Sequence, residues 1–272
     1  MPEGPEIRLA ADEVAAAIVG RKTTAIFFAF AHLKPHEASL TGQRVLAVET
    51  YGKAMLTRFE NGLNIYSHNQ LYGIWMVCPA NKAPETNRQL RLAIHNAEMW
   101  ALLYSASDIE VLNDDEVLTH PFLSQIGPDL LDQTITVDVV AQRFMDPAFH
   151  NKKLTSLLLD QRFVAGTGNY LRSEILFAAA VHPTLRPKDC TPTQIQALAQ
   201  ATVGLTRQSY ATRGITNDLE LAARLKADGW PWRKYRWWVF NRDGDVCHRC
   251  GGVIVKDEIG GRRIYFCAGC QT

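Results

Sequence analysis

The chain has 272 residues, of which 47% are hydrophobic and 21% charged, and its formal net charge is +1. This composition is typical of globular proteins and excludes a disordered or fibrous chain. At roughly 150 residues per domain, the length predicts about two domains. The apolar runs fall far short of the ~20 residues that span a bilayer, and the N-terminal segment PEGPE lacks the apolar core of a signal peptide. We therefore expect a cytoplasmic protein, without membrane contact.

The charge is unevenly distributed along the chain. Residues 107–150 carry a net charge of −8, which leaves +9 on the remainder, and the last 43 residues hold eight Lys or Arg against four acids. A segregated charge presents a basic face to a polyanion even when the total is near zero. Because charges also cluster by chance, this pattern permits nucleic-acid binding without requiring it.

The N-terminal part predicts one helix followed by short strands. Residues 5–19 favour a helix, since proline occupies the first position, apolar residues recur at helical spacing and Gly20 follows. Consecutive short strands then indicate an antiparallel sandwich or barrel. The segment ENGL at residues 60–63 predicts a two-residue hairpin turn with positive φ at both Asn61 and Gly62. The predicted strands are residues 23–30, 44–50, 54–59, 63–67, 73–78, 90–95 and 100–104.

Helical patterns dominate after the acidic stretch, and the segment GPD at residues 127–129 marks the expected boundary. The layout predicts a β domain (residues 1–130), a helical domain (131–237) and a small terminal module (238–272). Within the last module, two strands are expected to flank the cysteine pairs. The predicted helices are residues 137–145, 154–161, 170–180 and a longer one after 191–192, and the predicted terminal strands are 236–240 and 264–266.

Four of the six cysteines lie in the last 26 residues as two C-x-x-C pairs: Cys247, Cys250, Cys267 and Cys270. Two such pairs can place four thiolates around one Zn²⁺ at about 2.3 Å. Four protein ligands leave no open position, so the metal is expected to hold structure and to do no chemistry. Two disulfides are the alternative, although nothing else in the sequence indicates an oxidising compartment.

The N-terminus carries a possible nucleophile. Pro2 has a small side chain, so Met1 is expected to be removed, leaving a free secondary amine. An α-amino group with a pKa of about 8 is partly neutral at pH 7, and Glu3 and Glu6 are carboxylates able to exchange protons. Such an amine can attack a sugar C1′ and form an iminium. An ordinary acidic helix start is the alternative, because Glu in a first turn favours the helix dipole.

Short segments spread over nearly the whole chain match one known family in the right order. They are PEGPEI (2–7), YGK (51–53), SHNQLYG (67–73), LYSASD (103–108), HPF (120–122), GTGNY (166–170), YATRG (210–214) and the terminal cysteine pairs. In these segments the chain resembles the formamidopyrimidine-DNA glycosylase and endonuclease VIII family. The segments PEGPE and QLY are closer to the endonuclease VIII branch.

The resemblance implies a base-excision-repair DNA glycosylase with AP (apurinic or apyrimidinic site) lyase activity that removes oxidised pyrimidines such as thymine glycol. It implies an α+β multi-domain fold: an N-terminal antiparallel β-sandwich with a leading helix, a helical domain with a helix–two-turn–helix, and a terminal four-cysteine zinc-finger β-hairpin. The implied partner is damaged double-stranded DNA. The sequence shows no sign of an obligate oligomer, and DNA contacts on one face suit a monomer.

By matching position, the resemblance makes Pro2 the Schiff-base nucleophile that drives β- and then δ-elimination. Glu3 becomes the acid that helps to open the sugar, and Glu6 assists proton transfer. Lys53 matches a lysine that contacts a phosphate, and Arg262 matches an arginine that assists the second elimination. Without the resemblance, Lys53 would be an exposed strand lysine.

Base flipping leaves a hole in the duplex. Gln70, Leu71 and Tyr72 combine an amide, an apolar wedge and an aromatic ring that can fill it; the alternative is a strand edge with Leu71 and Tyr72 in the core. Asn169 is expected to reach the phosphate of the lesion, although GTGN is also a common turn with an Asn cap. Arg263 can replace Arg262 if the hairpin register differs.

Two departures from the family bear on specificity. Gln125 stands where we expect an arginine that contacts DNA, so binding is expected to be weaker or less salt-sensitive. Residues 215–238 are longer and richer in tryptophan than expected, which leaves the lesion preference open. Three alternatives remain: the 8-oxoguanine and formamidopyrimidine branch, a lesion sensor that binds without cutting, and a metal-dependent nuclease, which the saturated cysteine site disfavours.

Overall fold

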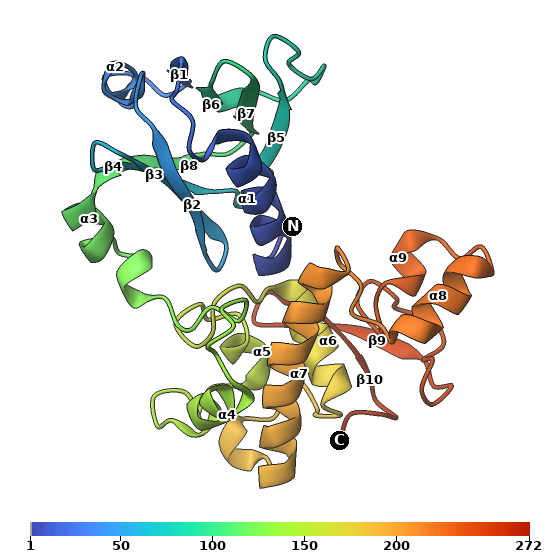
Figure 1. Cartoon of the computed structure of the whole chain (residues 1–272). Coiled ribbons are helices and arrows are strands. Elements are labelled where there is room, and N and C mark those ends of the chain that lie inside the picture. Colours follow the sequence, from blue (N-terminus) through green and yellow to red (C-terminus); the bar gives the residue numbers. More distant parts are fainter. Residues whose placement is uncertain (1) are drawn as a thin grey trace. The chain divides into compact units, whose positions relative to one another are not determined.

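The computed structural model describes residues 2–272, and Met1, whose removal the sequence predicts, lies outside the described part. Two compact units are present (Figure 1). The first contains Pro2 and residues 6–125, and the second contains residues 3–5 and 126–272. Within the described chain, no helix is both long and apolar enough to cross a membrane.

The first unit is a sandwich of two four-stranded antiparallel sheets, with strand orders β1-β6-β7-β5 and β2-β3-β4-β8. Its core takes apolar side chains from both sheets and from α1, including Val14, Phe28 and Met55. The predicted antiparallel sandwich with a leading helix is confirmed. The elements are α1 (Gly4–Ile18), β1 (Ala25–Phe28), α2 (His36–Leu40), β2 (Val45–Tyr51), β3 (Ala54–Phe59), β4 (Leu63–His68), β5 (Ile74–Pro79), β6 (Leu90–His95), β7 (Met99–Tyr104), β8 (Asp108–Asn113), α3 (Asp114–Thr119) and the 3₁₀ turn η1 (Leu123–Gln125).

Strand β8 was not predicted. It stands at the end of the strand order next to β4 and is therefore an edge strand, whose outward positions tolerate acids such as Asp108 and Glu110. Ile109 and Leu112 are its buried residues. The charges concealed this short pattern, and the segment resembled an acidic loop.

The predicted turn at Asn61 and Gly62 is wrong in type. Only Gly62 has a positive φ, of 76°, and three residues connect β3 to β4. Such loops combine a type I turn with one left-handed residue. The Asn61 amide shapes the loop, because Oδ1 accepts from the Leu63 N–H (3.2 Å) and Nδ2 donates to the Ser39 carbonyl (2.8 Å).

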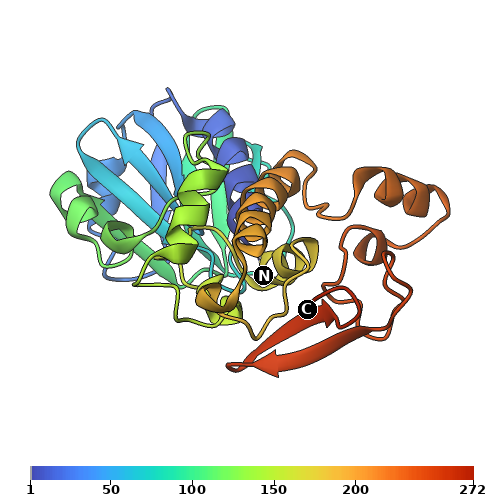
Figure 2. The ribbon, with the colours of Figure 1, turned by 90° about the horizontal axis from the view of Figure 1, so that it is seen from below.

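The second unit consists of helices around an apolar core, followed by a two-stranded hairpin; Figure 2 shows its two arrows side by side. The predicted helix at residues 137–145 is confirmed with the same bounds. The longer predicted helix is also confirmed: Thr191 and Gln194 form a capping box at its start. The elements are α4 (Val137–Met145), α5 (Leu154–Leu157), α6 (Asn169–Ala178), η2 (Pro187–Asp189), α7 (Pro192–Ala211), α8 (Leu219–Ala227), α9 (Trp232–Tyr235), β9 (Ile254–Ile259) and β10 (Arg262–Cys267).

Helix α5 ends four residues earlier than predicted. The chain turns away because its next groups bind the loop before α6: the Leu158 carbonyl accepts from the Thr167 hydroxyl (2.5 Å). The Gln161 side chain donates to the Thr167 carbonyl (3.0 Å) and accepts from the Gly166 N–H (3.0 Å). This exchange of bonds fixes the loop that precedes α6.

The predicted strand at residues 236–240 is wrong. The backbone N–H groups of Trp238, Val239 and Phe240 all donate to the carboxylate of Glu174, at 2.8 to 2.9 Å. Successive N–H groups in a strand point in opposite directions, so three of them cannot meet one carboxylate. The partner of β10 is instead β9, whose exposed charged residues concealed its strand pattern.

Candidate functional site

The N-terminus of α6 holds Glu3. This side chain is only 1% exposed, and its carboxylate accepts from the backbone N–H groups of Tyr170 (2.8 Å) and Leu171 (3.3 Å). The first N–H groups of a helix have no partner within the helix, and the helix dipole favours an anion there. The carboxylate is therefore fixed in place by α6, with a favourable environment for its negative charge.

Glycines make room for this arrangement. The Gly4 N–H donates to the Gly166 carbonyl (2.7 Å), and a Cβ at Gly4 would lie 2.7 Å from the Gly166 Cα. A Cβ at Gly168 would collide with the carboxyl group of Glu3. Such close approach of two backbones needs residues without side chains. The glycines of the GTGN segment therefore serve the Glu3 contact.

Pro2 directly precedes Glu3 and is half-buried. Glu6 lies in the first turn of α1 and is also half-buried. The chain thus continues from the predicted nucleophile straight into the anchored carboxylate. Glu6 is not part of the hydrogen bonds that Glu3 makes with α6.

Lys53 lies in the two-residue turn between β2 and β3, after Gly52, which has a φ of 60°. Glycine at the first central position is typical of a type II′ hairpin turn. The neighbouring pair is Ala54 with His68 on β4. Burial lowers the pKa of His68, and Lys53 lowers it further, whereas Asp108 acts to raise it. The positive charge of Lys53 therefore acts on His68, which directly precedes the loop that carries Gln70.

Gln70, Leu71 and Tyr72 form the loop between β4 and β5, as predicted, and Leu71 and Tyr72 are 52% and 70% exposed. The alternative that placed these two side chains in the core is wrong. The loop is shaped by the positive φ of Gln70 (49°) and by the tight Gly73 N–H to Asn69 carbonyl bond (2.8 Å). Two large apolar side chains are thus presented to solvent on a constrained loop.

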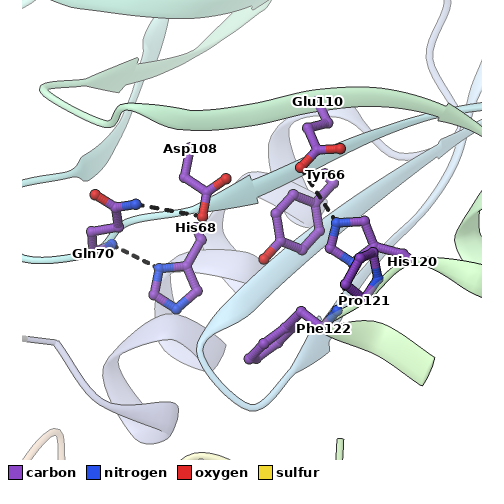
Figure 3. Close-up of a pocket in the computed structure, with 8 residues that line it drawn as sticks. All are labelled: Tyr66, His68, Gln70, Asp108, Glu110, His120, Pro121 and Phe122. Atoms are coloured by element: carbon purple, nitrogen blue, oxygen red, sulfur yellow. Dashed lines mark hydrogen bonds and ion pairs between the residues drawn. The ribbon is translucent and has the colours of Figure 1, made fainter. Parts of the chain in front are cut away.

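The Gln70 amide lies at one end of a pocket of about 410 Å³ (Figure 3). Its Oε1 accepts from the Ser107 hydroxyl (2.8 Å), and its Nε2 donates to Asp108 (3.5 Å). The Gln70 backbone N–H donates to Nδ1 of His68 (3.0 Å). The sequence did not indicate His68 and Ser107 as supports, since polar residues near a loop are common. The pocket is lined by Tyr66, His68, Gln70, Asp108, Glu110, His120, Pro121 and Phe122.

Asn169 is the first residue of α6, two residues after the fixed backbone of Thr167. Arg262 and Arg263 are exposed and begin β10 directly after a Gly260–Gly261 turn. Both glycines have positive φ, 62° and 70°, as a type I′ hairpin turn requires. Adjacent strand residues face opposite sides of a hairpin, so the two arginines do not share one face.

Gln125 ends η1 and is exposed. Together with Lys53 and residues 70–72 it belongs to the first unit, whereas Glu3, Asn169 and the hairpin arginines belong to the second. Within the second unit, Glu3 and Asn169 meet at one helix terminus, and α6 lies beside β10.

The four cysteine sulfurs lie within 4.8 Å of one another. The Cys250–Cys267 and Cys247–Cys270 separations are 3.4 and 3.8 Å, too long for the S–S bond of about 2.05 Å, so the disulfide alternative is wrong. A tetrahedral zinc site with Zn–S of about 2.3 Å needs sulfurs about 3.8 Å apart. The N–H groups of Arg249 and Gly252 donate to the sulfurs two residues earlier, at 3.4 Å. The cluster therefore fits one structural Zn²⁺.

Two family models match the chain. The model described as the formamidopyrimidine-DNA glycosylase N-terminal domain matches residues 1–105, and the one described as the formamidopyrimidine-DNA glycosylase H2TH domain matches residues 126–219. Endonuclease 8 of Salmonella typhi and endonuclease 8 of Shigella flexneri are each 48% identical to the chain over 271 residues, which covers all of both sequences.

Solved structures agree in fold. Lactococcus lactis formamidopyrimidine-DNA glycosylase, non-covalently bound to DNA with an AP site, matches with a TM-score of 0.80 at 21% identity over 99% of each chain. A MutM structure in complex with DNA that contains carbocyclic 8-oxo-G matches with a TM-score of 0.80 at 21% identity over the full length of both chains. At such identities the likeness establishes the fold alone, and it agrees with the sandwich, helical and hairpin parts described above.

Proposed function

Because the chain belongs to the formamidopyrimidine-DNA glycosylase and endonuclease VIII family, we propose that it removes oxidised pyrimidines such as thymine glycol from duplex DNA. The enzyme class itself, a bifunctional DNA glycosylase and AP lyase that binds damaged DNA, follows from the full-length identity of 48% with endonuclease 8. The lesion class rests on the endonuclease VIII-type segments PEGPE and QLY.

Pro2 and Glu3 form the proposed catalytic pair. The Pro2 amine attacks C1′ of the flipped nucleotide and forms an iminium, while the damaged base leaves. Glu3, a carboxylate at the start, takes the proton that the Pro2 amine loses on attack and passes it to the sugar oxygen as the ring opens. The observation that carries this proposal is the pair of N–H bonds from α6, which holds the Glu3 carboxylate directly after the nucleophile. A catalytic acid held in this way needs no reorganisation during the reaction.

The remaining roles follow the same scheme. Glu6 assists proton transfer, and Lys53 and Asn169 bind phosphates. Arg262 binds a phosphate and assists the second elimination, with Arg263 beside it. The iminium drives β- and then δ-elimination, which leaves a one-nucleotide gap with phosphates at both ends.

A flipped base requires a substitute in the duplex. The exposure of Leu71 and Tyr72 supports a wedge role, and the amide of Gln70 is suited to pairing with the orphaned base. Gln125 contributes a neutral contact. The zinc-bound cysteines hold the β9–β10 hairpin in shape and take no part in the reaction.

We also propose that the enzyme works as a monomer with the DNA of the bacterial cytoplasm. Residues 1–130, 131–237 and 238–272 are its proposed functional domains. The endonuclease 8 relatives come from bacteria, and a single chain carries all of the proposed catalytic residues.

Borohydride trapping on a duplex with one thymine glycol tests the proposal. The mature protein should form a covalent adduct, whereas a chain that retains Met1 should not, because the amine is then acylated. Glu3→Gln should trap poorly on thymine glycol and still trap on a preformed AP site, since only base removal needs the acid.

Binding of the thymine glycol duplex without an adduct would contradict the catalytic assignment and favour a lesion sensor. Trapping on 8-oxoguanine in preference to thymine glycol would place the chain with the purine-lesion branch. Loss of strand cleavage in a chelator that leaves the zinc bound would favour a metal-dependent nuclease.

A further inference from the structure

Arg172 is a buried arginine in the first turn of α6. It is 1% exposed, and its guanidinium makes three hydrogen bonds. One goes to the Thr155 carbonyl (3.0 Å), one to Oδ1 of Asn169 (2.6 Å) and one to the carbonyl of Arg263 (2.7 Å). A single side chain therefore joins the first residue of α6 to the backbone of the β9–β10 hairpin.

The bond to Asn169 determines which end of its amide faces outward. A guanidinium is a donor only, so it binds the amide oxygen and never the NH₂ group. With Oδ1 directed to Arg172, the Asn169 Nδ2 donors face away from the arginine. Donors are what an anionic phosphate needs. Arg172 thus sets the Asn169 side chain in the orientation that suits phosphate binding.

The bond to the hairpin acts on the neighbouring residue. The Arg263 carbonyl belongs to the second residue of β10, and Arg262 directly precedes it. Both residues follow a turn of two glycines, which does not restrict the backbone by itself. The bond from Arg172 anchors the hairpin tip where Arg262 emerges.

This arginine occupies an unfavourable position. A cation in the first turn opposes the helix dipole, and its three acceptors are neutral. Burial lowers the pKa of Arg172 to about 10; Glu3 acts to raise it, and Arg262 lowers it further. A hydrophobic side chain of similar volume often stabilises a protein as well as a buried charge does. Local rules of this kind are broken mainly at functional sites.

We propose that Arg172 is a positioning residue that sets the Asn169 amide and the Arg262 hairpin tip together as one phosphate clamp, and that its charge favours the bound anion. This inference rests on the phosphate-binding roles proposed above for Asn169 and Arg262. It assigns Arg172 no contact with DNA.

The test compares Arg172→Gln, Arg172→Lys and the control Arg207→Met. Glutamine both donates and accepts, so it no longer dictates the Asn169 orientation, whereas lysine stays a donor-only cation. Arg207 also braces loops of this unit through three carbonyls, those of Leu130, Asp132 and Ile135, without contact to Asn169 or the hairpin.

The first measurement is the affinity for a duplex with a tetrahydrofuran abasic analogue, which requires no catalysis. Arg172→Gln should weaken binding roughly 10- to 100-fold, the size expected for lost hydrogen bonds to a charged group. Arg172→Lys should recover part of the loss, and Arg207→Met should bind as the wild type does. In the double variant with Asn169→Ala, the combined loss should be smaller than the product of the two single losses, because both substitutions remove the same interaction.

The second measurement is the ratio of β- to δ-elimination product in a single turnover on an AP-site duplex. Arg172→Gln should leave more product at the β stage, since Arg262 assists the second elimination. A loss of folded protein lowers the total product and leaves this ratio unchanged, so the ratio separates positioning from stability.

Wild-type affinity and product ratio in a zinc-loaded Arg172→Gln protein would overturn the proposal, as would equal losses in Arg207→Met. If Arg172→Gln does not fold, the affinity and the product ratio of Arg172→Lys decide whether the proposal holds. The proposal would also be overturned if the loss of affinity in the Arg172→Lys, Asn169→Ala double variant equalled the product of the two single losses. A wild-type protein that binds the analogue and cleaves nothing would refute the proposed lyase function, and the binding cycle would still decide the role of Arg172.

Discussion

The two units hold the residues of the proposed site in opposite ways. In the first unit, Lys53 and residues 70–72 lie in tight turns between strands, and Leu71 and Tyr72 are largely exposed. In the second unit, Glu3 and Arg172 are almost completely buried around the N-terminus of α6. The first unit therefore carries its proposed contacts on turns, whereas the second supports its site with buried residues, although its hairpin arginines, Arg262 and Arg263, are exposed.

This difference separates the effects of substitutions. An exposed turn residue contributes little to the packed core, so its loss should change function and leave stability almost unchanged. A buried polar residue with several partners contributes to both. Changes near the start of α6 should accordingly reduce folding and chemistry together.

Gly168→Ala should have a larger effect than any substitution in the exposed turns. The added Cβ would collide with the carboxyl group of Glu3, and such overpacking costs about 1–3 kcal/mol of unfolding free energy. Displacement of the proposed acid should also lower base excision on the order of 10²-fold. Urea unfolding and single-turnover kinetics on a thymine glycol duplex measure the two effects.

Gly204→Ala is the matched control. Gly204 lies inside α7, and a Cβ there meets nothing within 4 Å. The substitution should stabilise the protein by about 0.5–1 kcal/mol, because alanine favours a helix, and should leave excision unchanged. Equal behaviour of the two variants would contradict the described contact between Gly168 and Glu3.

Leu71→Ala and Tyr72→Ala should show the opposite pattern. Both side chains are exposed, so the unfolding free energy should stay within about 0.5 kcal/mol of the wild type. Excision should fall about tenfold, because the wedge helps to offset the cost of unstacking. A large loss of stability with normal excision would show that these residues serve the fold.

Acid should loosen the Gln70 loop by a small amount. Neutral His68 accepts the Gln70 N–H at Nδ1, and burial, followed by Lys53, lowers the pKa of His68 while Asp108 opposes this. The folded state thus binds this proton less readily than the unfolded state, so stability is present above the unfolded pKa of about 6.5 and is lost as pH falls through the folded pKa.

The expected loss between pH 7.5 and pH 5.5 is below about 1 kcal/mol. It appears as the difference between the wild type and His68→Phe, measured by urea unfolding at both pH values. Burial also lowers the pKa of His95. Because His95 is present in both proteins, its contribution cancels in the difference. An identical pH dependence of the two proteins would mean that the His68 bond contributes nothing.

Much of the fold could be predicted from local sequence patterns. The strand pattern of the sandwich, the start of a long helix after residues 191–192 and the spacing of the cysteine pairs depend on neighbouring residues, and the structure agrees with each. Strands β8 and β9 carry charges on their exposed faces, which concealed them. The segment at residues 236–240 has strand-like composition, but its N–H groups bind Glu174, a residue far away in sequence.

Contacts between residues far apart in sequence also limited the prediction of the site. The family-like segments indicated Glu3, Asn169 and Arg262, whose roles stay proposals. No pattern indicated Arg172, because α6 is buried on all sides from Tyr170 to Phe177 and a charged residue in such a helix resembles a solvent-facing position. Its partners come from three separate parts of the chain, which only the folded structure brings together.

The carboxylate of Glu174 has a consequence for biosynthesis. It is buried, which raises its pKa, while bonds from the Thr216 hydroxyl and from three N–H groups of residues 238–240 oppose that shift. During translation, the three N–H donors leave the ribosome more than sixty residues after Glu174. Until they arrive, the carboxyl group of Glu174 lacks three of its hydrogen-bond donors, so a chain that ends before residue 238 should be less stable in this unit than the full chain.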